Sequence, residues 1–435
     1  MKARSLSIWW MNPTYLFLLL ISIVVAGAYL IPGDSYITFY RVDKYIHDGN
    51  LEFLILPAVC FIAGSVIASL TAGARRPARE QVFSSMLKHQ EGYIKAWIKL
   101  LFTLTLFGYA AWFLIMLQNG FTLSLFLNVV KGEPGAIYDI TENFKSITGV
   151  TSFTNFGIPF VILAVYYQVS NGKRTFNGML AIVVLLTLVR AIFFSERLAL
   201  MEILLPAIII MLAVKQKQGK KLRLVHYYPL IGLAALIGFF GISEYFRSWL
   251  SFYVNVYPSF WEFIVTRFFG YYVTALNTGT LYLEQLGFQS VPFPYFTLEW
   301  IWKFPGMSGD AYFSAFGINP EAGINTTLES WGNPEFNNPS GLMLPYQDYS
   351  LGEALLFWGL IGYVSGMLYA GFKHGGTLGM VLYPIWMVGI LEIPRYLYFS
   401  SGRFFPCWIV LLTFTFMLHY NAKKLVSWQP AGRRA

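Results

Sequence analysis

The stretch FFSERLALMEILLP, residues 193–206, places charged side chains inside a long apolar run. Glu196, Arg197 and Glu202 lie within it, and Arg190 precedes it by three residues. Ionisable groups in lipid cost about 3 kcal/mol near the bilayer centre, so they normally face a protein interior or a wet cavity and act there. A guanidinium group is a permanently charged, planar fork that matches phosphate oxygens, which makes Arg190 and Arg197 candidates for binding pyrophosphate. For Arg197, an ion pair with Glu196, Glu202 or an acid of another helix is the alternative.

Further arginines occupy outward or intramembrane positions of the sequence. They are Arg41, Arg247, Arg267, Arg395 and Arg403. We predict that Arg267 and Arg403 join Arg190 and Arg197 in binding pyrophosphate, with a structural ion pair again the alternative. Charge-assisted hydrogen bonds contribute roughly 1.5–3 kcal/mol each, so two or three arginines could stabilise a departing pyrophosphate. Such a site needs no cofactor and no metal ion, and the sequence contains no cluster with metal-ligand spacing.

Several outward carboxylates could accept a proton from a hydroxyl group of a substrate. Glu329 lies in NTTLESWGNPEFNNPSG and Asp348 in YQDYSLGEALLFWG, and these two are the predicted catalytic residues. Asp43 and Asp48 in the first outward loop and Glu392 in an apolar run are further candidates. The residue types alone do not select one of them.

The elements that position these residues are membrane helices. Hydrophobic residues make up 56% of the 435 residues and charged residues only 12%, which excludes a soluble globular protein. A helix needs about 20 apolar residues to cross a bilayer. That rule predicts ten spans, at 14–31, 51–70, 97–117, 151–169, 178–194, 198–214, 229–246, 352–372, 380–398 and 404–420.

The charges predict which side of the membrane each loop occupies. Short loops rich in Lys and Arg stay in the cytoplasm, and here they occur at every second loop, so both termini are predicted to be cytoplasmic. The net charge of +9 follows from this topology and does not indicate nucleic-acid binding. The run 178–214 is nearly twice one crossing and predicts a hairpin that turns near Ser195, Glu196 and Arg197. The cytoplasmic basic residues outside the spans are Lys2, Arg4, Arg75, Arg76, Arg79, Lys88, Lys173, Arg174, Lys215, Lys217, Lys220, Lys221, Arg223, Lys373, Lys423, Lys424, Arg433 and Arg434.

The long aromatic-rich loop between spans seven and eight divides the chain into three predicted parts. Residues 1–246 hold spans one to seven, 247–351 form a large outward loop rich in aromatic residues, and 352–435 hold the last three spans and a tail. Segment 259–286 is predicted to be interfacial, re-entrant or a pair of short helices, and a pair would raise the span count to twelve. Gly362 and Gly366 have a small-xxx-small spacing that is typical of helix packing.

Four segments resemble the O-antigen polymerase, or oligosaccharide repeat-unit polymerase, family. They are MNPTYLFLLL, FFSERLALMEILLP, RFFGYYVTALNTG and NPSGLMLPYQDYSLGEALLFWGLIGYVSGMLYAG. The resemblance runs over most of the chain, although members of the family share topology better than sharp motifs.

The resemblance implies an all-α polytopic enzyme of the bacterial inner membrane. Such an enzyme transfers a growing glycan from undecaprenyl pyrophosphate to the terminal sugar of a newly flipped, lipid-linked repeat unit at the periplasmic face. Donor and acceptor lipids, membrane lipids, a chain-length regulator and a flippase are the implied partners. By the same analogy Arg197 and Arg267 bind pyrophosphate and Asp348 belongs to the polar site of the late loop. That loop contains no histidine, which moves the expected base to a carboxylate.

Other functions remain open at this stage. An O-antigen ligase, or a C-type glycosyltransferase that uses the acidic first loop RVDKYIHD, would carry out related chemistry on a lipid-linked sugar. A transporter or flippase for an anionic lipid would also need intramembrane arginines. Against transport, the outward sequence is one-sided and no internal repeat is visible.

Overall fold

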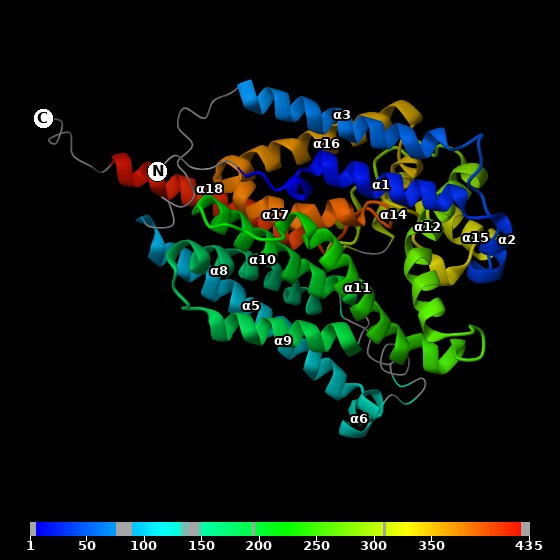
Figure 1. Ribbon diagram of the computed structural model, residues 1–435, viewed down its shortest axis with the longest axis horizontal. Coiled ribbons are helices and arrows are strands. Elements are labelled where there is room, and N and C mark those ends of the chain that lie inside the picture. The colour runs from blue at the N-terminus through cyan, green and yellow to red at the C-terminus, as the bar shows by residue number, and fades with distance from the viewer. Residues whose placement is uncertain are drawn as a thin grey trace, which may run out of the picture.

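The computed structural model describes residues 6–74, 89–131, 133, 136, 147, 149–193, 196–307 and 310–427, and the residues described contain helices and no strands (Figure 1). Ser195 and most of the basic residues of the first cytoplasmic loops and of the tail lie outside this part. Ten of the described helices are apolar candidates for membrane spans. They are α1 (Pro13–Leu30), α3 (Glu52–Ala74), α5 (Glu91–Gln118), α8 (Gly157–Asn171), α9 (Asn177–Phe193), α10 (Arg197–Lys217), α11 (Tyr228–Glu244), α16 (Leu351–His374), α17 (Thr377–Glu392) and α18 (Phe405–Ser427).

These helices fall on the ten predicted spans. Among the described residues, eight helical segments have the length and apolar composition needed to cross a membrane, and α9 and α17 are apolar but shorter. With a rise of 1.5 Å per residue, a helix of 16 or 17 residues covers about 25 Å, slightly less than a bilayer core of about 30 Å. The predicted span 380–398 is longer than its helix because α17 ends at Glu392.

The long segment between α11 and α16 is mostly helical. It contains the π-helix η5 (Tyr245–Tyr253), the long helix α12 (Phe260–Leu286), and then a series of short elements. These are α13 (Glu299–Trp302), α14 (Ala311–Phe316), α15 (Pro320–Trp331), η6 (Pro334–Phe336) and η7 (Leu344–Gln347). Two shorter helices precede this region in the chain, α2 (Gly33–Ser35) and α6 (Leu123–Lys131).

Segment 259–286 forms one uninterrupted helix, so the predicted helical pair is wrong. Ser259 caps the helix by accepting a hydrogen bond from the backbone N–H of Glu262. Gly270 and Gly279 lie inside this helix, at points where a neighbouring segment comes close. A Cβ atom at Gly270 would overlap the Tyr40 ring, and one at Gly279 would overlap the Pro339 backbone and the Met343 side chain. In Figure 1, α12 runs across the end of the helix bundle rather than along it.

The close pair α3 and α16 depends on glycine. A Cβ atom at Gly362 would overlap the carbonyl oxygen of Phe61, and one at Gly366 would meet Ser65 and Ala68. Backbones that approach this closely gain dispersion contacts along the whole helix pair. The prediction that Gly362 and Gly366 mediate helix packing is therefore confirmed.

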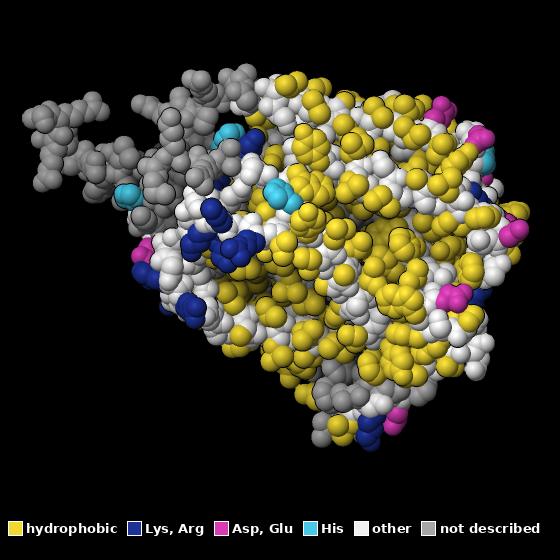
Figure 2. Space-filling view, viewed as in Figure 1, with side chains coloured by type: hydrophobic (Ala, Val, Ile, Leu, Met, Phe, Trp, Pro, Cys, Tyr) yellow, Lys and Arg dark blue, Asp and Glu magenta, His cyan; other side chains and the backbone are white. Residues whose placement is uncertain are grey.

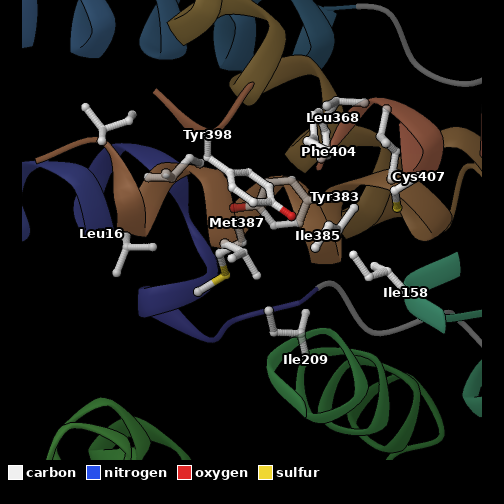
Figure 3. Close-up of a cluster of buried hydrophobic side chains, with 14 of the residues drawn as sticks. Leu16, Ile158, Ile209, Leu368, Tyr383, Ile385, Met387, Tyr398, Phe404 and Cys407 are labelled. Atoms are coloured by element: carbon white, nitrogen blue, oxygen red, sulfur yellow. The ribbon is translucent and has the colours of Figure 1, made fainter. Parts of the chain in front are cut away.

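The core lies where α10, α16, α17 and α18 meet the first helix. Figure 3 shows Tyr383, Tyr398, Phe404 and Cys407 among aliphatic side chains. The two buried tyrosines keep polar partners: Tyr383 donates to the carbonyl oxygen of Met11 at 2.6 Å and Tyr398 to Glu202 at 2.7 Å. Cys407 is buried in this core, and Cys60 is half-buried.

Charged side chains are sorted between the two ends of the molecule. In Figure 2, Lys and Arg of the described residues gather mostly at the left, and Asp and Glu mostly at the right, where α12 and α15 lie in Figure 1. The flanks between them are hydrophobic, as the lipid-facing surface of a membrane protein requires.

Candidate anion-binding site

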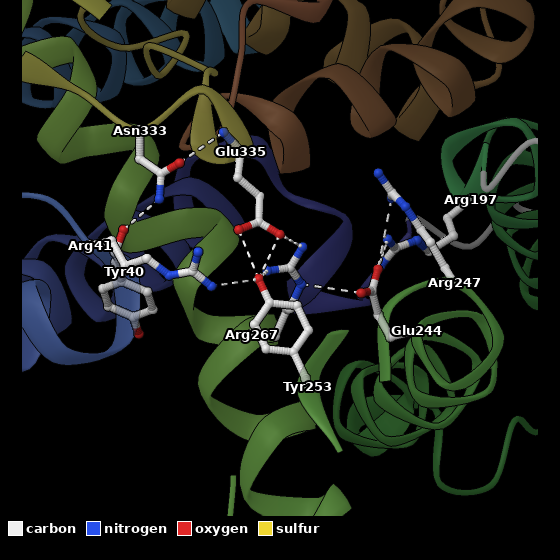
Figure 4. Close-up of polar contacts among 9 residues, drawn as sticks. All are labelled: Tyr40, Arg41, Arg197, Glu244, Arg247, Tyr253, Arg267, Asn333 and Glu335. Atoms are coloured by element: carbon white, nitrogen blue, oxygen red, sulfur yellow. Dashed lines mark hydrogen bonds and ion pairs between the residues drawn. The ribbon is translucent and has the colours of Figure 1, made fainter. Parts of the chain in front are cut away.

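A cluster of arginines and glutamates joins α10, α11 and α12 (Figure 4). Glu244 ends α11, is completely buried, and contacts three guanidinium groups. Arg197, the first residue of α10, binds Oε1 of Glu244, and Nε of Arg267 on α12 lies 3.1 Å from Oε2. The side chain of Arg247 is 43% exposed and lies 3.8 Å from the same carboxylate. One buried carboxylate therefore faces three positive charges.

The position of Glu244 coincides with a change in helix geometry. The α-helix ends at this residue and the chain continues as the π-helix η5. Wide π turns are rare and frequently occur at functional sites. Here η5 brings Arg247 and Tyr253 to the same cluster as Glu244.

A second carboxylate completes the cluster from the late outward segment. Glu335 lies 2.6 Å from Nη2 of Arg267 and accepts hydrogen bonds from the Tyr253 hydroxyl at 2.8 and 2.9 Å. Arg41, which has a left-handed backbone, donates to the same hydroxyl at 3.2 Å. Asn333 fixes the turn that carries Glu335, because its side chain accepts from the Glu335 N–H and donates to the Tyr40 carbonyl oxygen (Figure 4).

The cluster carries more positive than negative charge. Arg41, Arg197, Arg247 and Arg267 contribute four cations against the two carboxylates of Glu244 and Glu335, an excess of two positive charges. We name this set of six residues the cation-rich cluster. The two buried arginines are matched by the two carboxylates, so the excess charge lies on Arg41 and Arg247, which are exposed and can meet an incoming anion.

Aromatic rings surround the two buried guanidinium groups. The Arg197 guanidinium lies 4.2 Å from the centre of the Phe240 ring, and the Arg267 guanidinium lies 5.2 Å from that of Tyr253. Burial alone would lower the pKa of Arg267, but the charges of Glu244 and Glu335 more than reverse this and raise the pKa. The group therefore remains charged in a water-poor environment, where its hydrogen bonds to an anion are strong.

The other predicted arginines belong to a different group. Arg190 and Arg403 both bind Glu196, at 2.5 and 2.9 Å, and Arg403 also binds the buried Glu202 at 2.9 Å. Burial would raise the pKa of Glu196, yet the charges of Arg190 and Arg403 hold it below its usual value. Arg190 also donates to the Thr154 hydroxyl at 2.6 Å.

Arg395 and Glu392 form a further pair at 3.4 Å in the same region. We name Arg190, Arg395, Arg403 and the glutamates at 196, 202 and 392 the balanced cluster, because its three cations match three carboxylates. The Tyr271 ring faces Arg197, Arg267 and Arg395, so it stands between the two clusters. The structure thus brings all four predicted arginines into one region but divides them into two electrostatic environments.

The carboxylate of Asp348 is already hydrogen-bonded to donors of the protein. It is 1% exposed, and its carboxylate accepts from the backbone N–H groups of Tyr295, Phe296 and Thr297 and from the Thr297 hydroxyl, at 2.6–3.0 Å. Burial raises the pKa of Asp348, although these hydrogen bonds act in the opposite direction. This placement favours a structural role in which Asp348 holds the segment before α13 against the start of α16.

Glu329 lies on the exposed side of α15. Asp48 is remote from the cation-rich cluster, because its neighbours His47 and Asn50 bind Glu284, near the far end of α12, and the backbone of Asp43 is held by Asn277, ten residues from Arg267. Seventeen residues separate Glu284 from Arg267 along this helix, which corresponds to about 25 Å. The first loop therefore contributes Arg41 to the cluster rather than Asp43 or Asp48.

Sequence reasoning missed Glu244 and Glu335. Glu244 lies near the end of the apolar run 229–246. An ionisable side chain in an apolar run is a candidate functional residue, which is the criterion that selected Arg190. Glu335 follows Asn333 and Pro334, an N-cap residue and a first-turn proline that predict an ordered helical turn. The same Asn-Pro pattern, Asn319-Pro320, starts the helix that carries Glu329, so this signal alone does not select Glu335.

Comparisons with known proteins identify no relative. No protein-family model, no curated protein and no solved structure matches this chain. The geometry of the two clusters is therefore the main guide to function.

Proposed function

We propose that the protein is a membrane glycosyltransferase that polymerises oligosaccharide repeat units carried on undecaprenyl pyrophosphate. The four sequence segments that resemble repeat-unit polymerases suggest the reaction, and the cation-rich cluster supplies the chemistry that it needs. We further propose ten spans in the inner membrane of a bacterium, with both termini cytoplasmic and the cluster toward the periplasm. The sorting of charge between the two ends of the molecule supports this orientation (Figure 2).

The observation that carries the proposal is the excess of two positive charges around Glu244 and Glu335. When a glycan leaves its lipid carrier, the bond between C1 and the phosphate oxygen breaks and its electron pair stays on the pyrophosphate. Guanidinium groups that are already oriented stabilise this developing charge without having to reorganise. Arg41 and Arg247, the exposed members of the cluster, have donors available for the phosphate oxygens.

Glu335 is the carboxylate that we propose as the base. Its side chain is 33% exposed and lies beside Arg267, whereas Asp348 is buried and held by backbone donors. In the proposed step, Glu335 takes the proton of an acceptor hydroxyl, the resulting oxygen attacks C1 of the donor, and the pyrophosphate leaves as an anion bound by arginines. A general base of this kind typically contributes about 100-fold or more to the rate.

The first prediction concerns Arg267. Replacing it with Lys keeps one charge but cannot reach Glu244 and Glu335 together and cannot present a planar fork. We expect Arg267→Lys and Glu335→Gln to remove the glycan ladder from cells and leave single-repeat caps, with normal amounts of protein in the membrane. Glu329→Gln, a matched change on exposed α15, should leave the ladder intact.

The measurement is an electrophoretic profile of cell-surface glycan from a strain that lacks the chain and carries each variant on a plasmid. A full ladder from Arg267→Lys would contradict the proposed pyrophosphate role, and a full ladder from Glu335→Gln would remove this residue as the base. Loss of all glycan attached to lipid A in the strain without the chain would indicate a ligase instead.

A further inference from the structure

The turn from α10 to α11 is strongly basic. It carries four exposed cations, and we name them the loop cations: Lys215, Lys220, Lys221 and Arg223. None of the four forms an ion pair with a carboxylate of the described residues, whereas Lys95 and Lys173 on other segments bind Glu91 at 2.7 and 3.2 Å. The charges of the loop cations are therefore not neutralised by any acid in the part of the chain that the structure describes.

Two tryptophans near the N-terminus hold the backbone of this loop in place. Nε1 of Trp10 donates to the carbonyl oxygen of Val225 at 2.8 Å, and Nε1 of Trp9 donates to that of His226 at 3.3 Å. These contacts join the 3-10 helix η1 (Trp9–Met11) to the 3-10 helix η4 (Val225–Tyr227), which directly precedes α11. The loop cations are thus carried by a backbone that is tied to another part of the protein.

Exposed apolar side chains follow the loop cations along the chain. Leu224, Tyr227, Leu230 and Ile231 are each more than half exposed. The segment Val225–Tyr253, which contains α11, is also the least covered of the eight candidate spans among the described residues, with 17% of its apolar window buried. In Figure 2, Lys and Arg side chains gather at the left beside a hydrophobic surface, in the region where the chain passes from α10 to α11 in Figure 1.

We infer that the loop cations bind the phosphate head of an anionic phospholipid, whose acyl chains lie along the exposed face of α11. Clusters of Lys and Arg directly beside a membrane helix attract anionic lipids, and each cation strengthens binding about fivefold. A free phosphate compound would offer the same charge but would leave Leu224 and Leu230 uncovered. The combination of cations and exposed apolar side chains therefore selects a lipid as the occupant.

This lipid site is separate from the cation-rich cluster. The helix α11 begins at Tyr228 beside the loop and ends at Glu244 in the cluster, so about 25 Å of helix lies between them. The inference therefore does not depend on the proposed reaction. At their other ends α10 and α11 are joined by the pair of Arg197 and Glu244. A lipid that binds this folded arrangement and not the unfolded chain stabilises the protein.

Two triple variants test the site at equal net charge. The loop variant combines Lys220→Gln, Lys221→Gln and Arg223→Gln, which change exposed side chains that have no ion-pair partner among the described residues. The control variant removes the same charge from exposed positions of α5 and of the segment between α8 and α9, by combining Lys99→Gln, Lys173→Gln and Arg174→Gln.

The experiment titrates the purified full chain in detergent with phosphatidylglycerol and counts bound lipid by native mass spectrometry. We expect the loop variant to bind this lipid at least about tenfold more weakly than the unmodified protein, and the control variant to bind it with little change. Phosphatidylethanolamine with the same acyl chains has no net charge and should bind weakly to all three proteins. Phosphatidylglycerol should raise the melting temperature of the unmodified protein and of the control variant, but not that of the loop variant.

Four results would overturn the inference. Unchanged lipid binding by the loop variant would show that the loop is not the site. Equal weakening in both triple variants would show that net charge attracts the lipid without a defined site. Binding of phosphatidylethanolamine as tight as that of phosphatidylglycerol would remove the role of the anionic head. Competition by glycerol phosphate at the same concentrations as the lipid would make a free phosphate compound the occupant.

Discussion

The four predicted arginines lie in one region of the protein but have different electrostatic surroundings. Arg197 and Arg267 share Glu244 with a third arginine, whereas Arg190 and Arg403 are matched by two carboxylates, Glu196 and Glu202. Binding an anion in the balanced cluster would leave carboxylates without their counter-charge. We therefore propose the anion-binding role for Arg197 and Arg267 and a structural role for Arg190 and Arg403.

The structural role of Arg403 can be tested by removing its charge. Arg403→Ala leaves Glu202, which is 2% exposed, without its ion pair, and breaking a buried pair typically costs about 3–5 kcal/mol. We expect a lower melting temperature for the detergent-purified variant. Adding Glu202→Gln should recover part of the loss, because Gln can still accept the hydrogen bond from Tyr398. A single variant as stable as the parent protein would show that the pair is not structural.

Asp348 provides a second test at this scale. An Asn at this position retains one acceptor oxygen and turns an amide N–H₂ toward backbone donors, so we expect Asp348→Asn to lose about 1–3 kcal/mol of stability. Thermal unfolding followed by intrinsic fluorescence measures this loss, with exposed Glu329→Gln as the unaffected control. If Asp348→Asn melts normally but stops chain extension, the catalytic role predicted for Asp348 gains support.

At the scale of elements, glycines determine how closely helices approach. Gly362 of α16 lies against the backbone of α3, while Gly352, near the start of the same helix, has no neighbour within 4 Å of a built Cβ. The helix α12 shows the same effect: its glycines accommodate neighbours instead of ending the helix.

A comparison of substitutions at Gly362 and Gly352 separates the effect of helix packing from that of helix propensity. Both substitutions by Ala gain about 1 kcal/mol of helix propensity, but only Gly362→Ala forces α3 and α16 apart. We expect Gly362→Ala to reduce the yield of monodisperse protein in size-exclusion chromatography and Gly352→Ala to leave it unchanged. Equal yields would mean that α3 can shift without loss.

At the scale of the whole molecule, the charge distribution predicts how the chain is oriented in a membrane. Lys220 follows the C-terminal end of α10, and Glu329 lies on α15, which is at the opposite end of the molecule from the gathered Lys and Arg side chains (Figures 1 and 2). The positive-inside rule places the first in the cytoplasm and the second outside.

Labelling of single cysteines tests this orientation. In a background with Cys60 and Cys407 replaced, a membrane-impermeant maleimide should label Glu329→Cys in spheroplasts and Lys220→Cys only after the membrane is broken. The opposite pattern would invert the topology and place the cation-rich cluster on the cytoplasmic side, where the proposed reaction does not occur.

The sequence by itself determined the helical class, the positions of the apolar helices and the expected sidedness. These depend on local properties, because hydrophobic length and loop charge act within one segment. It also indicated which arginines are unusual, since a charge in an apolar run is visible without a fold.

Only the tertiary structure decided which acid each arginine meets. Arg403 pairs with Glu202 across 201 residues, and Arg197 pairs with Glu244 across 47. Such pairings depend on how separate helices pack, which residue spacing within one segment does not encode. For that reason Glu335 and Glu244 were missed, and the division into a cation-rich and a balanced cluster emerged only when α10, α11 and α12 were placed together.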